Sequence, residues 1–167
     1  MAKKPRNPRN PEAKLNLSAL ENRQRSVGIE LHVLAGFLAR VNREIGLAEG
    51  SVFIRFVDDS EMARLNQTFR KKRETTDVLS FPTEARHRPR QLRSRPAKLL
   101  KGFLGDIAIS PRIARRNAKS LGRTFSGELQ ILILHGVLHL LGYDHESDRG
   151  EMERIENRLR RRLGLIS

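Results

Sequence analysis

The sequence predicts an α/β (α+β) fold in a single domain, because segments with the pattern of strands alternate with segments with the pattern of helices along a chain of 167 residues. With 38% hydrophobic side chains, a chain of this length can bury a core of its own. It has no internal repeat and no stretch of the roughly 18 apolar residues that a membrane span requires, so we expect a soluble, cytoplasmic protein. Residues 1–13 are rich in Pro, Asn, Lys and Arg, which predicts a disordered basic tail. Residues 14–167 are expected to form the domain.

Two strands and two helices are expected in the first part of this domain. Apolar and polar residues alternate in KLNLSALENRQ, which predicts an edge strand. Apolar residues recur at helical spacing over 33–45 and are followed by Gly46, which predicts an amphipathic helix with a glycine stop. The β-branched and aromatic segment 51–59 predicts a strand inside the sheet. Asp59 or Ser60 is then expected to cap a short helix, EMARLNQTF.

Two more strands and three more helices are expected in the remainder. A strand is predicted over 76–81, stopped by Pro82, and another over GFLGDIAIS. Ser110 is expected to cap the helix PRIARRNAKSLG, which has proline at its first position. Ser126 is the expected cap of SGELQILILHGVLHLLG. A charged terminal helix with one apolar face is predicted over 147–163.

The charge of the chain favours an anionic partner. Lys and Arg number 33 against 19 Asp and Glu, a net charge of +14, and such a positive field attracts polyanions, nucleic acid first. Residues 86–101 form a cationic loop insertion with seven basic side chains and no acidic one. Charge alone does not separate RNA from DNA, and a role in solubility is the alternative. The absence of cysteine fits a reducing compartment and leaves histidine and carboxylate as the metal ligands.

The segment HGVLHLLGYDH has the spacing of a metal site. His135 and His139 are four residues apart, so they project from the same face of a helix. Gly142 can adopt the left-handed conformation that ends a helix and returns His145 to that face. Three histidines with an open fourth position are typical of catalytic zinc, whereas structural sites usually have four protein ligands. The alternative is a set of histidines hydrogen-bonded within a core.

The residue between the two helical histidines excludes the most obvious reaction. The spacing H-x-x-x-H-x-x-G-x-x-H is typical of one class of zinc metalloproteases, but Gly136 stands where their general-base glutamate would be. Peptide hydrolysis is therefore disfavoured, although a bound metal ion still acts as a Lewis acid. Phosphodiester cleavage could use such a site, with an arginine stabilising the transition state and the RNA 2′-hydroxyl as nucleophile.

Three motifs carry a resemblance to a known family. LNQTFRKKRETTDVLSFP, LGDIAIS and HGVLHLLGYDH, in this order within residues 65–145, resemble the YbeY family of bacterial metal-dependent endoribonucleases. The resemblance implies a small mixed sheet of about four strands with about five helices, the metal-binding helix lying beside the cleft. It also implies one zinc ion (Zn2+) bound by His135, His139 and His145, and a catalytic role for Arg70. Without the resemblance, Arg70 is one of four successive basic residues with a solvated role.

The resemblance further implies a substrate and a set of cleft residues. The family acts on single-stranded RNA, with roles in 3′-end maturation of small-subunit ribosomal RNA and in ribosome quality control. The implied partners are thus ribosomal RNA and the small ribosomal subunit, with neither DNA nor membrane expected. Thr76, Asp77 and Ser80 are expected to shape the cleft wall, and Asp106 to orient a neighbour. Asp144 is expected to hold an imidazole ligand or to stabilise the turn.

Two other functions remain compatible with the residues. One is a ribosome-associated RNA-binding factor in which the zinc ion is structural and needed for folding. The other is a metallohydrolase of peptides or small molecules, which spacing alone suggests and which the missing glutamate and the net charge disfavour.

Overall fold

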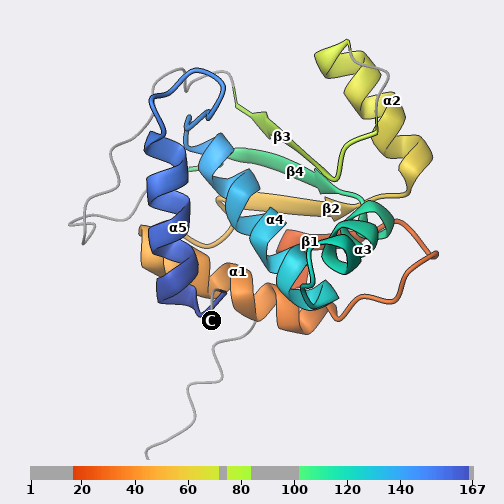
Figure 1. Ribbon diagram of the computed structural model, residues 1–167, viewed down its shortest axis with the longest axis horizontal. Helices are drawn as coiled ribbons and strands as arrows, with labels where there is room; N and C mark the ends of the chain where they lie inside the picture. Colours follow the sequence, from red (N-terminus) through yellow and green to blue (C-terminus); the bar gives the residue numbers. More distant parts are fainter. Residues whose placement is uncertain (1–16, 72–74, 84–101, 166–167) are drawn as a thin grey trace, which may run out of the picture.

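A mixed four-stranded sheet with the order β1-β2-β4-β3 forms the frame of the fold (Figure 1). In this computed structural model, residues 17–71, 75–83 and 102–165 are described, so the predicted basic tail and the cationic insertion lie outside the described residues. β1, β2 and β4 run parallel, and β3 pairs antiparallel with β4 at one edge. The strands are β1 Leu20–Asn22, β2 Val52–Phe56, β3 Val78–Pro82 and β4 Gly105–Ile109.

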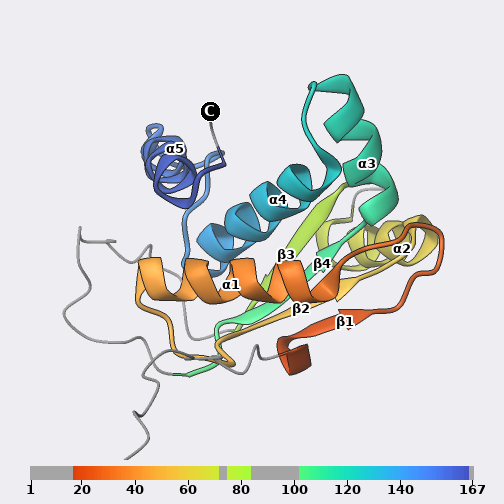
Figure 2. The same ribbon diagram turned by 90° about the horizontal axis from the view of Figure 1, so that it is seen from below.

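Five helices complete the described fold, and they divide between the two faces of the sheet. α1 and α4 lie on one face, with α5 packed against them, and their buried side chains share one large core with Ile54, Ile107 and Ile109 (Figures 1 and 2). α2 packs on the other face, where Met62 joins Ala108 in a smaller cluster. The helices are α1 Leu31–Ile45, α2 Asp59–Arg70, α3 Pro111–Ser120, α4 Phe125–Leu140 and α5 Glu151–Leu163.

The predicted fold class is therefore confirmed, with its mixed sheet of four strands and its five helices. The alternation of side chains along a strand explains the burial of β4, since Ile107 faces α4 while Ala108 faces α2. The interior position of β2, between β1 and β4, is also as predicted. So is the glycine stop of α1, where Gly46 has a φ of 80° and its N–H donates to the Asn42 carbonyl. No helix of the described part of the chain has the length and apolar character to cross a membrane.

The first strand is shorter than its alternating pattern predicts. It is an edge strand, but it begins at Leu20, which pairs with Ile54, and the residues Leu17–Ala19 before it form a 3-10 turn. The alternation does not hold because Ala19 and Leu20 are buried in succession while Leu17 is half exposed. At the other edge, β3 also starts later than predicted and includes Pro82, which an edge strand tolerates.

The predicted cap of α2 was wrong, whereas the predicted cap of α3 was right. α2 is capped by Asp58 and not by Asp59 or Ser60, because the Asp58 side chain accepts from the Glu61 N–H. The prediction for Ser110 is confirmed, since its hydroxyl accepts from the N–H of the third helical residue of α3.

The start of each of the last two helices also differs from the prediction. α4 is capped by Thr124 instead of Ser126, since the Thr124 hydroxyl accepts from the Gly127 N–H at 3.1 Å. α5 begins at Glu151 instead of residue 147, because the Asp148 carboxylate accepts from the N–H groups of Gly150, Glu151 and Met152. In each case an oxygen earlier or later in a polar run takes the free N–H groups of the first turn.

Candidate metal centre

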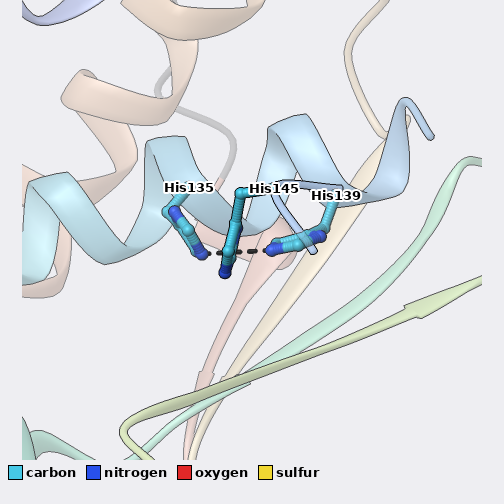
Figure 3. Close-up of side chains that lie close together, drawn as sticks. All are labelled: His135, His139 and His145. Atoms are coloured by element: carbon cyan, nitrogen blue, oxygen red, sulfur yellow. Dashed lines mark hydrogen bonds between the residues drawn. The ribbon is translucent and has the colours of Figure 1, made fainter. Parts of the chain in front are cut away.

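The three histidines of the predicted site come together at the end of α4. His135 and His139 lie one turn apart on the same side of this helix (Figure 3). The helix ends at Leu140, Gly142 follows with a φ of 90°, and the chain turns back to bring His145 against the other two rings. Tyr143, which is almost fully buried, anchors this turn in the core.

The nitrogen atoms of these rings are spaced as metal ligands require. The Nε2 atoms of His135 and His139 are 3.1 Å apart, and one ring nitrogen from each of the three histidines lies within 4.8 Å of the others. In a tetrahedral site with Zn–N bonds of about 2.0–2.1 Å, the nitrogen atoms lie roughly 3.3 Å apart. The three residues can therefore hold one metal ion, and His145 is exposed, so the centre opens to solvent.

The electrostatic surroundings keep at least one of these ligands neutral. Burial lowers the pKa of His139 to about 4, and the charges of His135, His145 and Arg70 act in the same direction. Only Asp144 opposes this shift. An imidazole binds a metal ion through the lone pair of its neutral form, so His139 is ready to bind at neutral pH.

A carboxylate that the sequence pattern did not reveal orients the first histidine. Glu156 of α5 lies 3.1 Å from Nδ1 of His135 and also accepts a hydrogen bond from Arg160. Burial disfavours the charged form of Glu156, but the hydrogen bond from His135 and the charge of Arg160 outweigh it, so the pKa of this carboxyl is lowered. The ionised carboxylate can only accept. His135 therefore donates through Nδ1 and presents the lone pair of Nε2 to the centre.

Gly136, which stands where a protease would have its general base, faces the sheet and not the three histidines. A Cβ atom added to Gly136 would lie 2.9 Å from both Cδ1 and Cγ2 of Ile107 in β4. The backbone of α4 therefore approaches the sheet so closely here that a side chain does not fit. The Ser80 hydroxyl of β3 donates to the Gly136 carbonyl at 3.1 Å and ties the same turn to the sheet edge.

The histidines form one wall of a cleft of about 770 Å³. The same side of the cleft is completed by the chain from Gly142 to Ser147. Of the predicted site residues, the structure brings five into this cleft beside the histidines: Arg70, Thr76, Asp77, Ser80 and Asp144.

Arg70 reaches the cleft from the last position of α2. Its charge is one of the causes that lower the pKa of His139. The preceding Phe69 is 63% exposed and packs edge-on against Phe81 of β3, with ring centroids 4.9 Å apart. This contact fixes the end of α2 to the sheet edge, and Lys71, with a φ of 56°, ends the helix at that point.

The polar residues of the β3 wall are held by the sheet and by α3. The Asp77 carboxylate accepts from the Asn117 amide of α3 at 2.9 Å. The Thr76 hydroxyl donates to the Val78 carbonyl at 3.4 Å. Together with the hydrogen bond from Ser80 to α4, these contacts hold the side chains of Thr76 and Asp77 in the wall of the cleft.

The two remaining predicted residues have different positions. The Asp144 carboxylate accepts from the Glu146 N–H and from the Ser147 hydroxyl, so it stabilises the turn that carries His145. Asp106 lies in β4 between two residues that face α4, so its side chain is directed to the opposite face of the sheet. Among the described residues that line the cleft, Asp106 is absent.

The fold and the site together define a class: an α+β protein in which three histidines able to hold a metal ion share a cleft with an arginine. The chain belongs to the family described as Endoribonuclease YbeY, whose sequence profile matches residues 19–164. The family resemblance of the three motifs is thereby confirmed.

Individual relatives agree with this assignment. A protein named Endoribonuclease YbeY from Koribacter versatilis is 41% identical over 145 residues, which cover 87% of this chain and 85% of the relative. Another of that name, from Solibacter usitatus, is 45% identical over 130 residues, covering 77% and 76%. The solution structure of TM1509 from Thermotoga maritima matches with a TM-score of 0.56 and 29% identity, covering 86% of this chain and 87% of the other.

Proposed function

We propose that this protein is a zinc-dependent endoribonuclease that cleaves single-stranded RNA, with Arg70 as its catalytic residue. The observation that carries the proposal is that Arg70 and the three histidines line the same cleft. The relatives named as endoribonucleases and the net charge of +14 support an RNA substrate. Maturation of the 3′ end of small-subunit ribosomal RNA and ribosome quality control are the cellular roles that we propose on the family resemblance.

The residues of the cleft can divide the chemistry between them. When bound by the three histidines, the metal ion supplies Lewis-acid charge next to the scissile phosphate. Arg70 carries a guanidinium whose donors match the geometry of phosphate oxygens. It stabilises the negative charge that develops on those oxygens in the transition state.

The nucleophile need not come from the protein. RNA carries its own 2′-hydroxyl, whose attack on the adjacent phosphorus would form a 2′,3′-cyclic phosphate as the bond to the 5′-oxygen breaks; the 2′-proton would pass to solvent and the departing 5′-oxygen would take up a proton from solvent. The demand for a protein base is therefore weaker than in peptide hydrolysis, and at position 136 the close approach to Ile107 leaves no room for a glutamate. The same observation argues against peptide hydrolysis. It favours a phosphodiester substrate over the metalloprotease reaction that the histidine spacing suggests.

The test is cleavage of an end-labelled single-stranded RNA by wild type, His139→Ala, Arg70→Ala and a control, Arg64→Ala. Arg64 is an exposed arginine of the same helix that lies outside the cleft lining. We expect His139→Ala to lose both metal and cleavage. Arg70→Ala should keep its metal and lose about a hundredfold in rate, the magnitude of losing one transition-state donor.

The control variant should cleave as wild type does. Equal cleavage by all four proteins would mean a contaminating nuclease and would refute the proposal. A protein that bound RNA normally but never cleaved it would instead support an RNA-binding factor with a structural metal.

A further inference from the structure

A basic cavity lies outside the metal cleft. It has a volume of about 470 Å³ and lies between α3 and the turn that precedes α1. We call it the α3 pocket. Four of its six lining residues are cationic and none is acidic; the six are Ser26, Val27, Arg112, Arg115, Arg116 and Lys119. The buried side of α3 carries Ile113, Ala114 and Ala118, so the cations gather on its outer face.

Two of these four cations already have partners and two do not. Arg112 lies 3.6 Å from the Asp59 carboxylate, and the Arg115 guanidinium stacks 4.8 Å above the Phe125 ring. Within the described part of the chain, Arg116 and Lys119 form no ion pair, and both are exposed. The pocket therefore keeps an excess of positive charge that a ligand can neutralise.

The pocket and the metal cleft are joined by α3 and α4. α3 reaches the cleft through Asn117, which holds Asp77 of the cleft wall. α3 lies beside the start of α4 (Figure 1). There the Arg115 guanidinium lies over the ring of Phe125, the first residue of α4. His135 comes ten residues after Phe125, so the metal centre begins about 15 Å further along α4. A flexible polyanion could occupy both places at once.

We propose that the α3 pocket binds a backbone phosphate of the same RNA whose reacting segment lies in the metal cleft. This inference rests on the proposed function. A phosphate fits the lining because Arg116 and Lys119 offer cationic donors and the lining holds no carboxylate and no aromatic ring to recognise a base, while the Ser26 hydroxyl already donates to Gln24. The contact would be independent of sequence and would fix where the strand enters the cleft.

The test compares two pairs of substitutions that remove the same charge. Arg116→Gln with Lys119→Gln empties the pocket of its unpaired cations. Arg158→Gln with Arg161→Gln removes two exposed arginines of α5 that line neither the pocket nor the cleft. Each protein is measured for RNA affinity by fluorescence anisotropy and for kcat and KM, with one RNA long enough to span both sites and one short oligonucleotide that fills only the cleft.

We expect the pocket variant to bind the long RNA about tenfold more weakly at low salt, with an unchanged kcat. Its plot of log affinity against log salt should be shallower by about 0.7, because one phosphate contact on a single strand contributes about 0.7 and the variant loses one such contact. The short oligonucleotide should show no difference, and the α5 variant should behave as wild type with both RNAs. Arg116→Lys, which keeps the charge, should retain affinity.

Other outcomes separate the inference from the proposed function. Equal weakening by the pocket and α5 variants would mean that only net charge matters and would overturn the inference, as would an unchanged affinity in both. If wild type binds the long RNA but never cleaves it, the proposed function fails. The affinity ratio between the two variants still decides whether the pocket holds RNA.

Discussion

Gly136 shows how one residue restricts the chemistry of a metal site. From the sequence it marks only the place of a missing general base. In the structure it lies where α4 touches β4, and a Cβ there would be 2.9 Å from two atoms of Ile107. Both observations have the same cause, since the side of the helix that faces the sheet cannot also face the cleft.

Replacing Gly136 should therefore destabilise the protein instead of adding a base. Overpacking costs about 1–3 kcal/mol, which exceeds the gain of up to about 1 kcal/mol in helix propensity from glycine to alanine. We expect Gly136→Ala to lower the free energy of unfolding in urea. Gly136→Glu should lower it further, because it also buries a carboxylate, and it should show no peptide hydrolysis.

Gly28→Ala is the matched control, since an added Cβ there meets nothing within 4 Å and the residue needs no positive φ. If Gly136→Ala and Gly28→Ala proved equally stable, the close approach of α4 to β4 would be refuted.

The lowered pKa of His139 predicts how the metal-free protein responds to acid. Its pKa falls from 6.5 to about 4 on folding, mainly because of burial, so below 6.5 the unfolded chain binds the proton more readily. The stabilising contribution of neutral His139 is complete above about pH 6.5 and is lost as pH falls towards 4. Melting temperatures of chelator-treated protein across this range should fall less steeply for His139→Gln than for wild type. An identical dependence of melting temperature on pH in the two proteins would contradict the lowered pKa of His139. The control is His32→Gln, which replaces an exposed histidine of α1.

Local spacing explains which site residues the sequence predicted. His135 and His139 share a helix and His145 follows within one turn, so their meeting needs no knowledge of the tertiary fold. Arg70 was predicted only from the family resemblance, because nothing in a run of four basic residues distinguishes one of them from the others. Glu156 escaped prediction because it lies 21 residues from His135 on another helix, and only the packing of α5 against α4 brings them together.

The contact between α5 and α4 makes the terminal helix part of the metal centre. Glu156 of α5 is the hydrogen-bond acceptor that fixes the tautomer of His135, and Arg160 in turn holds Glu156. Such partners of a ligating histidine typically change metal affinity 10–100-fold. We expect Glu156→Gln to bind zinc at least about tenfold more weakly, measured by competition with a chromogenic chelator.

The control for this change is Glu153→Gln, which removes an exposed carboxylate from the same helix. It should bind metal as wild type does. Unchanged zinc affinity in Glu156→Gln would mean that α5 only covers the core and leaves the ligand unaffected.

The elements themselves were easier to predict than their ends. Periodicity gives the type of each helix and strand, because burial of one face controls it over many residues. The start of a helix depends on which of several neighbouring oxygens takes the free N–H groups. In the run Asp58, Asp59, Ser60 each residue is a plausible cap. Asp58 is the cap, while the Asp59 carboxylate accepts a hydrogen bond from the hydroxyl of Ser110, the cap of α3.

At the level of the complete fold, the alternation of strand and helix patterns predicted one α/β (α+β) domain but not the order of its strands. Two pairs of sequence neighbours, β1 with β2 and β3 with β4, lie side by side, whereas β2 pairs with β4 across α2 and β3. This arrangement puts Arg70, at the start of the connection to β3, on the cleft that α4 lines. The position of the arginine is thus a property of topology, which pattern analysis of separate segments does not contain.

The distribution of the core predicts what removal of the metal ion does to the protein. The large core joins α1, α4 and α5 to the sheet, and it includes Tyr143 just before the last histidine. Of the three histidines, His135 and His139 lie in α4, whereas His145 lies in the turn that Asp144 stabilises. We therefore expect chelation to abolish RNA cleavage, while the protein still melts in one cooperative transition at a somewhat lower temperature and still binds RNA. Readdition of zinc should restore both cleavage and melting temperature. A protein that unfolded on chelation would mean a structural metal, since a fold with an intact core should not need one.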